Sequence, residues 1–138
     1  MTDTSIQTEI DEIVEEFDFL GDWEERYKYL IDMGKALPGL PDTDKTDLNK
    51  VKGCVSQVWL VTGHEGDRLT FQADSDAHIV RGLAALLLRI YSGRTPDEIL
   101  SVDAREVLKQ IGLSEHLSPQ RSNGLASMIG RIRGAAGA

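Results

Sequence analysis

The sequence predicts an α+β fold in which several helices pack on a small antiparallel sheet of about three strands. Helical apolar periodicity recurs in several separate segments, and two short segments rich in Val, Leu and aromatic residues flank a glycine-containing turn. Capping residues also stand in front of most of the helical segments. The chain of 138 residues has the length of one domain, and we expect residues 1–138 to form it.

Two helices are expected in the N-terminal third of the chain. The first ends before Gly21 and has an apolar stripe at three- and four-residue spacing, made of Ile6, Ile10, Ile13, Val14 and Phe17. Asp22, with Glu25 three residues later, predicts a capping box that begins the second helix, which continues to about Leu37. Proline and glycine at 38–41 end it, and residues 42–49 read as a polar loop.

The middle of the chain changes to a strand pattern. Residues 51–62 predict a strand, residues 63–66 a turn and residues 68–73 the returning strand. A turn centred near residue 64 or 65 pairs residue 54 with a position close to residue 75. Because both strands are short, a third strand or a helix must cover them.

The remaining chain reads as helical. The strongest pattern runs from about Ile79 to Tyr91 and ends at Gly93, and either Asp74 or Asp76 is expected to cap it. Three further helices are expected behind capping residues, in the segments 95–98, 103–110 and from 118 onward.

The charge distribution limits the classes of partner. The chain has 15 basic and 23 acidic residues, and residues 1–32 hold 11 of the acids and 2 of the bases. A net charge of −8 disfavours nucleic acids and anionic membranes, because both are negatively charged. No apolar run approaches the roughly 20 residues that span a bilayer, and no signal-peptide pattern is present. We therefore expect a cytoplasmic protein whose partners are proteins or small molecules.

Cys54 is the single cysteine and the main candidate for chemistry. Gly53 permits an unusual backbone angle, Lys52 supplies a positive charge, and Ser56 is polar where a buried strand would be apolar. These neighbours predict a junction between a loop and a strand. One thiol cannot form an intrachain disulfide, a redox pair or a self-contained zinc or iron–sulfur site. A small buried side chain is the alternative interpretation.

A hydrolytic cysteine enzyme would need a base, usually histidine, within hydrogen-bond reach of the thiol. His64 is expected at the hairpin tip, roughly 30 Å away along the strand. His78 is nearer, because the expected register places residues 74–76 and the next helix start beside the cysteine. A helix start favours the thiolate, whereas the charges of Asp74 and Asp76 oppose its formation.

Three motifs resemble signatures of the SufE family, including its CsdE branch. The segment VKGCVSQVW at 51–59 is similar to the family's glycine–cysteine–x–serine–x–valine–tryptophan signature. The segments DSDAHIVRGL at 74–83 and LSPQRSNGL at 117–125 resemble its DSDAxIVxGL and LxPxRxxGL segments, and residues 23–27 and 37–38 agree as well. The resemblance covers about residues 17–133, and the acidic N-terminal helix before it is less distinctive.

The resemblance implies a sulfur acceptor protein of iron–sulfur cluster assembly. Such a protein takes persulfide sulfur from a pyridoxal-phosphate-dependent cysteine desulfurase (SufS/CsdA-like) onto the signature cysteine, here Cys54, and stimulates the desulfurase. It then passes the sulfur to an iron–sulfur scaffold complex. The resemblance implies a carrier rather than an enzyme, with no metal and no cofactor, since the desulfurase brings its own cofactor and sulfur transfer is an exchange reaction.

Several residues around Cys54 are candidates for shaping its loop or binding a partner: Gly53, Ser56, Trp59, Asp74, Asp76, His78 and Arg121. Trp59 and the helix containing Leu83 are expected to shield a persulfide. Arg121 could bind the desulfurase or hold the loop, but it could also be a solvated residue or the partner of an acid. Two other classes stay open: an independent enzyme with a cysteine nucleophile, and a protein-binding module with an incidental thiol.

Overall fold

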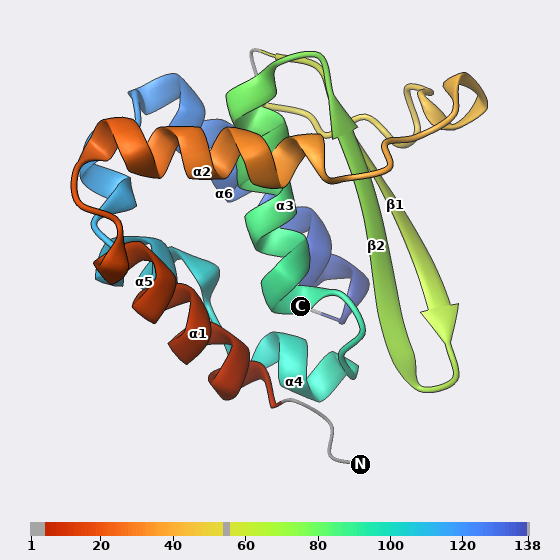
Figure 1. The fold of residues 1–138 in the computed structure, drawn as a ribbon. Helices are drawn as coiled ribbons and strands as arrows, with labels where there is room; N and C mark the ends of the chain where they lie inside the picture. The colour runs from red at the N-terminus through yellow and green to blue at the C-terminus, as the bar shows by residue number, and fades with distance from the viewer. Residues whose placement is uncertain (1–4, 54–55, 138) are drawn as a thin grey trace.

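The structure is a computed structural model that describes residues 5–53 and 56–137. The described residues form helices and one antiparallel hairpin (Figure 1), in the order α1 (Ile6–Phe19), α2 (Trp23–Lys35), η1 (Asp42–Asp44), β1 (Val58–Glu65), β2 (Arg68–Ser75), α3 (His78–Tyr91), α4 (Pro96–Leu100), α5 (Ala104–Gln110), η2 (Leu113–His116) and α6 (Pro119–Ala135). The predicted α+β class is confirmed. The sheet, however, has two strands within the described residues, whereas about three were expected.

Single bridges and a helix take the place of the expected third strand. Lys50 bridges to Trp59 at the β1 edge, and Leu69 bridges to Arg94 at the β2 edge, but neither contact extends into a ladder. The inward side chains of the hairpin belong to the same core as α3: Val58, Leu60, Leu69, Phe71 and Ala73. A helix therefore covers the hairpin, as short strands require.

Helix α3 lies at the centre of the core because it is apolar around most of its circumference. Nine of its 14 residues are buried. Figure 1 shows α2 crossing one side of α3 and the hairpin lying on another. At its C-terminal end, the buried Tyr91 hydroxyl donates to the Val102 carbonyl at 2.7 Å and accepts the Ala104 N–H at 2.9 Å. These bonds join α3 to the segment that leads into α5.

Helices α2 and α3 touch at two glycines. A Cβ atom at Gly82 would lie 2.2 Å from the Leu30 carbonyl oxygen, and one at Gly34 would lie 2.7 Å from the Gly82 nitrogen. Only glycine leaves room for backbones this close. The two helices therefore contact each other there with no layer of side chains between them.

Most predicted helix starts are confirmed by capping hydrogen bonds. The capping box predicted at Thr95 is present at the start of α4. Asp22 accepts the Glu25 N–H at 2.9 Å, but the Glu25 carboxylate accepts from Gly21 at 3.0 Å, one residue before the expected donor. The side chains of Ser5, Asp103 and Ser118 cap α1, α5 and α6.

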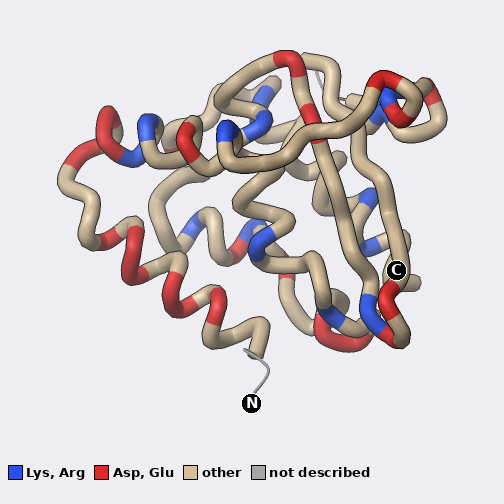
Figure 2. Tube along the Cα trace, turned by 45° about the vertical axis from the view of Figure 1, so that its right-hand side comes forward, with Lys and Arg blue, Asp and Glu red and all other residues tan. Residues whose placement is uncertain are grey.

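Charge is unevenly distributed over the elements. Helix α1 contains six acidic residues and no basic one, and Figure 2 shows these acids along its length. Among the helices of the described ranges, none is long and apolar enough to cross a membrane.

Candidate functional site

The hairpin is shifted relative to the prediction, because β1 spans Val58–Glu65 instead of residues 51–62 and β2 extends to Ser75 instead of residue 73. Strand β1 begins at Val58 and pairs it with Ser75, so the expected pairing of residue 54 with residue 75 is wrong. The turn is formed by residues 66–67, where Gly66 has a φ of +64°. Gly63, expected in the turn, lies instead in β1 opposite Thr70, and a Cβ atom there would be 2.7 Å from the Thr70 hydroxyl oxygen. A side chain at this strand position would therefore require Thr70 to change its rotamer.

The chain reverses direction between Val51 and Val58. The Val51 N–H donates to the Val58 carbonyl at 2.8 Å, and the Leu60 N–H donates to the Asn49 carbonyl at 2.9 Å. Strand β1 therefore begins at Val58, whereas the prediction began it at residue 51. We call residues 52–57 the cysteine loop. Cys54, the predicted site of chemistry, and its neighbour at position 55 lie outside the described residues.

Gly53 places the described start of the cysteine loop against α6. Its φ is +91°, a conformation that favours glycine, and a Cβ atom here would lie 2.6 Å from the Ser127 hydroxyl oxygen. The backbone angle favours glycine at this position, and a larger residue would also require the Ser127 hydroxyl to move.

The other end of the cysteine loop is held by the residues before α3. The Asp76 carboxylate accepts the backbone N–H of Gln57 at 3.1 Å and its side-chain amide at 3.5 Å. The Gln57 carbonyl accepts from the Ser75 hydroxyl at 2.8 Å and from the Asp76 N–H at 3.3 Å. The expectation that Asp74 or Asp76 caps α3 is wrong, because the N-cap residue is Ala77 and no side chain caps it. Both carboxylates are engaged elsewhere.

Asp74 is buried and fastens the chain that follows α2. Its Oδ2 atom accepts the Leu40 N–H at 3.0 Å, and its Oδ1 atom accepts the Ser75 N–H at 2.8 Å. The cations of Lys45 and Arg81 lie 3.5 Å and 3.6 Å from the carboxylate. Burial by itself raises the pKa of Asp74, but the two N–H groups and the two cations outweigh burial and lower it. Asp74 is therefore a structural anion beside the loop.

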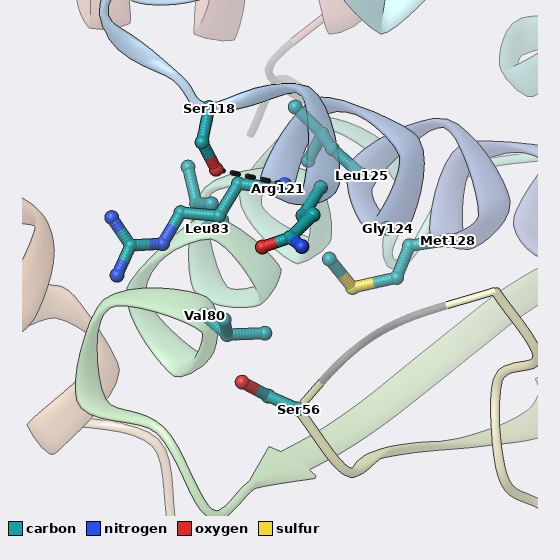
Figure 3. Close-up of a pocket in the computed structure, with 9 residues that line it drawn as sticks. Ser56, Val80, Leu83, Ser118, Arg121, Gly124, Leu125 and Met128 are labelled. Atoms are coloured by element: carbon teal, nitrogen blue, oxygen red, sulfur yellow. Dashed lines mark hydrogen bonds between the residues drawn. The ribbon is translucent and has the colours of Figure 1, made fainter.

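A pocket of about 330 Å³ lies beside the cysteine loop. Figure 3 shows Ser56 on one side and Arg121 on the other, with Val80 and Met128 between them. The pocket thus brings together two of the predicted candidates, Ser56 and Arg121. Its lining comes from the loop, from α3 and from the first half of α6: Ser56, Val80, Leu83, Ser118, Gln120, Arg121, Gly124, Leu125 and Met128.

Trp59 does not line this pocket. It is half-buried on β1 opposite Asp74, and the Lys45 ammonium lies 5.5 Å from the centroid of its ring. Of the two elements expected to shield a persulfide, the pocket therefore includes Leu83 and excludes Trp59.

The histidines lie away from the pocket. His78 is the exposed first residue of α3, His64 lies in β1 rather than at the hairpin tip, and His116 stacks on Trp23 with ring centroids 3.8 Å apart. None of the three lines the pocket beside Ser56. Within the described ranges, no three His, Asp or Glu side chains form a group that could hold a metal ion.

Some site residues were not singled out from the sequence. Gly124, Leu125 and Met128 follow Arg121 at helical spacings of three, four and seven, so they share its side of α6. That spacing could have identified them once Arg121 was a candidate. No sequence signal pointed to Lys45, which reaches Asp74 from a loop 29 positions earlier in the chain.

Known proteins are similar to this sequence over nearly the whole chain. A family model described as "SufE: Fe-S metabolism associated domain" matches residues 11–136. An uncharacterized SufE-like protein of Rhizobium meliloti is 54% identical over 130 residues, which cover 91% of this chain and 93% of that protein. A second, from Rhizobium etli, is 56% identical over 128 residues, covering 90% of this chain and 86% of that protein.

A solved structure has a similar fold. The solution structure of a hypothetical protein from Thermus thermophilus matches with a TM-score of 0.76 over 93% of both chains. Its sequence identity is 23%, so this similarity concerns the fold alone.

Proposed function

The chain belongs to the SufE family, whose domain is associated with iron–sulfur metabolism, and from this premise we propose that it is a sulfur carrier. Cys54 accepts persulfide sulfur from a pyridoxal-phosphate-dependent cysteine desulfurase, and the protein stimulates that enzyme. The sulfur then passes to an iron–sulfur scaffold complex in the cytoplasm. In this proposal the protein is a carrier and activator with no cofactor of its own, and it binds neither nucleic acid nor membranes.

The observation that supports this proposal best is the way the cysteine loop is held. Its described ends are joined to stable elements, Gly53 against α6 and Gln57 against the residues before α3. The pocket lined by Ser56 lies directly beside it. A few hydrogen bonds between exposed groups hold Gln57, so a partner can release this end at small cost. A carrier needs such a loop, because its sulfur must reach first a donor and then an acceptor.

The proposed transfer is an exchange between sulfur atoms. The Cys54 thiolate attacks the terminal sulfur of the desulfurase persulfide, and a new S–S bond forms on Cys54. The S–S bond on the desulfurase breaks at the same time, and its cysteine leaves as a thiolate. The proton lost by the Cys54 thiol is balanced by protonation of that leaving thiolate. The step involves no net oxidation and therefore needs no external oxidant or reductant.

The pocket beside Ser56 offers an environment suited to this chemistry. Val80, Leu83 and Met128 provide apolar walls that shield an oxidisable sulfur from water. Arg121, exposed at the side of the pocket opposite Ser56, supplies a positive charge that favours an anionic thiolate or persulfide. The absence of a histidine from this lining weighs against a hydrolytic cysteine enzyme.

Mass spectrometry tests the proposal. The protein is incubated with a cysteine desulfurase and cysteine, and we expect a gain of about 32 Da, one sulfur atom, on the peptide that contains Cys54. A thiol reductant should remove it. Cys54→Ser is nearly isosteric, so we expect an unchanged circular dichroism spectrum with no mass gain and no stimulation of the desulfurase.

Two outcomes would point to other functions. If Cys54→Ser still stimulates the desulfurase with unchanged turnover, the acceptor mechanism is wrong and the thiol is incidental to a binding module. If the isolated chain turns over a small substrate through Cys54, it is an independent enzyme.

A further inference from the structure

A second concave surface lies between α1 and α2, on the side of the molecule away from the hairpin (Figure 1). It has a volume of about 420 Å³ and shares no residue with the pocket beside Ser56. We call it the acidic groove. Its lining is Glu12, Glu15, Glu16, Phe19, Leu20 and Tyr29.

One apolar side chain of the acidic groove, Phe19, contributes little to the fold, whereas Tyr29 also packs against the buried Phe17 with ring centroids 5.6 Å apart. Phe19, the last residue of α1, is 90% exposed, although residues of its kind usually pack inside. Leu20 and Tyr29 beside it are half-buried. In the described residues the other large exposed apolar side chain is Leu48, which is 83% exposed and does not line this groove. An exposed aromatic side chain on a concave surface is typical of a binding site.

The rim of the groove keeps an excess of negative charge. The Arg89 guanidinium from α3 donates hydrogen bonds to Glu9 and Glu16 and lies 3.9 Å from Glu12, so one cation faces three carboxylates. Glu15 forms no ion pair within the described ranges, and neither does Asp18 on the same helix. Three carboxylates share the single Arg89 cation, and in the described part of the chain Glu15 has no cation beside it. Glu12 and Glu15 therefore remain available to a cation of a partner protein.

We propose that the acidic groove binds a segment of a partner protein in which an apolar side chain is flanked by Lys or Arg. The apolar side chain packs against Phe19, Leu20 and Tyr29, and the cations meet Glu12 and Glu15. Charge selects this occupant, since the rim repels anionic lipids and nucleic acids. It also repels the same face of a second copy, which a two-fold dimer would bring into contact.

The proposal goes beyond sulfur transfer and does not depend on it. Because the groove and the pocket beside Ser56 have no residue in common, a segment bound in the groove does not occupy that pocket. The chain could therefore hold one protein on α1 and α2 while a different protein engages the loop.

Nuclear magnetic resonance titration of the ¹⁵N-labelled full chain tests this surface. The probe is a short synthetic peptide with Leu and Lys at helical spacing. Two matched peptides serve as controls, one with every Leu replaced by Ser and one with every Lys replaced by Glu. We expect saturable shifts confined to amides around Glu15, Phe19 and Tyr29, and at least about tenfold weaker binding of either control peptide.

Variants of the protein complete the test. Phe19→Ser and Glu15→Lys should each weaken binding, the first by about tenfold. Two control variants change exposed residues outside the groove: Leu48→Ser removes an apolar side chain, and Glu65→Lys reverses a charge. Both should bind the peptide as the wild type does. The amide spectra of all four variants show directly whether the fold is retained.

Three results would overturn the proposal. The first is that Phe19→Ser and Leu48→Ser bind the peptide equally well. The second is that the peptide with Leu and the peptide with Ser bind equally well. Either result would mean that the acidic residues attract any cationic peptide and that the apolar lining of the groove plays no part. The third is a dimer in analytical ultracentrifugation that Phe19→Ser abolishes, because the occupant would then be a second copy of the chain.

Discussion

Releasing Gln57 from Asp76 is expected to make Cys54 more reactive in the free protein. Four hydrogen bonds join Gln57 to Ser75 and Asp76, and the Asp76 carboxylate accepts two of them. Asp76→Ala removes those two and leaves the bonds to the Gln57 carbonyl. The end of the cysteine loop is then held less firmly, while the hairpin and α3 keep their own contacts.

The size of the effect follows from these bonds. The exposed bond from the Gln57 N–H to the carboxylate, at 3.1 Å, is worth about 1 kcal/mol, and the 3.5 Å bond adds little. A loss of about 1 kcal/mol raises the population of released loop up to about fivefold. Removing a negative charge near the loop also eases formation of the Cys54 thiolate. Both effects increase reactivity.

Alkylation by iodoacetamide at one pH, followed by intact mass, measures this directly because the chain has one cysteine. We expect wild-type Cys54 to react more slowly than a model thiol and Asp76→Ala to react up to about fivefold faster than wild type. Asp76→Asn keeps an acceptor but loses the charge, so it should fall between them. Asp67→Ala, which removes a charge in the hairpin turn, is the control. If Asp76→Ala reacts at the wild-type rate or more slowly, Asp76 does not restrain the loop.

Three further predictions concern stability, measured by urea unfolding. Gly53→Ala should lower the free energy of unfolding by about 1–2 kcal/mol because of the +91° φ angle. Adding Ser127→Ala should recover only the part of this loss that comes from the contact with the Ser127 hydroxyl. A urea midpoint of Gly53→Ala equal to that of the wild type would contradict the prediction. Arg89→Gln should lower the free energy of unfolding by about 2 kcal/mol, because it leaves carboxylates without their cation. Adding Glu16→Gln to that variant should restore part of the lost stability. Losses that simply add would show that Arg89 and Glu16 are not energetically coupled. Because the pKa of Asp74 is lowered, its stabilising effect is present above about pH 4 and disappears as the pH falls through the lowered pKa. Asp74→Asn should therefore be less stable at neutral pH and show a flatter acid profile, and parallel profiles would refute it.

Helix boundaries were predictable from the sequence because their signals are local. The Thr95 capping box and the Asp22 cap lie within four residues of the groups they bind, so the chain needs no tertiary contact to specify them. The family resemblance likewise rests on contiguous motifs, and the family match over residues 11–136 confirms it.

The hairpin register was not predictable from such local signals. Gly63 and Gly66 stand three positions apart and look equivalent in the sequence, but only Gly66 has a positive φ in the turn. Gly63 lies in β1 opposite Thr70, and this neighbour cannot be known before the strands are paired. Because the turn was centred too early in the chain, every expected partner was displaced, which is why residue 54 was placed opposite residue 75.

The anchoring of the site depends on distant contacts and was also missed. Asp74 binds Leu40, which lies 34 positions earlier, instead of the helix that follows it. Ser56 and Arg121 share one pocket only because α3 and α6 pack beside the cysteine loop. Sequence motifs therefore identified several residues of the site, whereas their partners became visible only in three dimensions.

The glycine contact between α2 and α3 has a practical consequence for experiments on motion. Since the backbones meet at Gly34 and Gly82 without intervening side chains, the two helices have no compressible layer along which to slide or separate. We therefore expect spectroscopic labels on the outer surfaces of α2 and α3 to keep a constant separation when a partner binds. That pair of helices provides a fixed internal reference distance, against which the displacement of a probe attached to Cys54 can be measured.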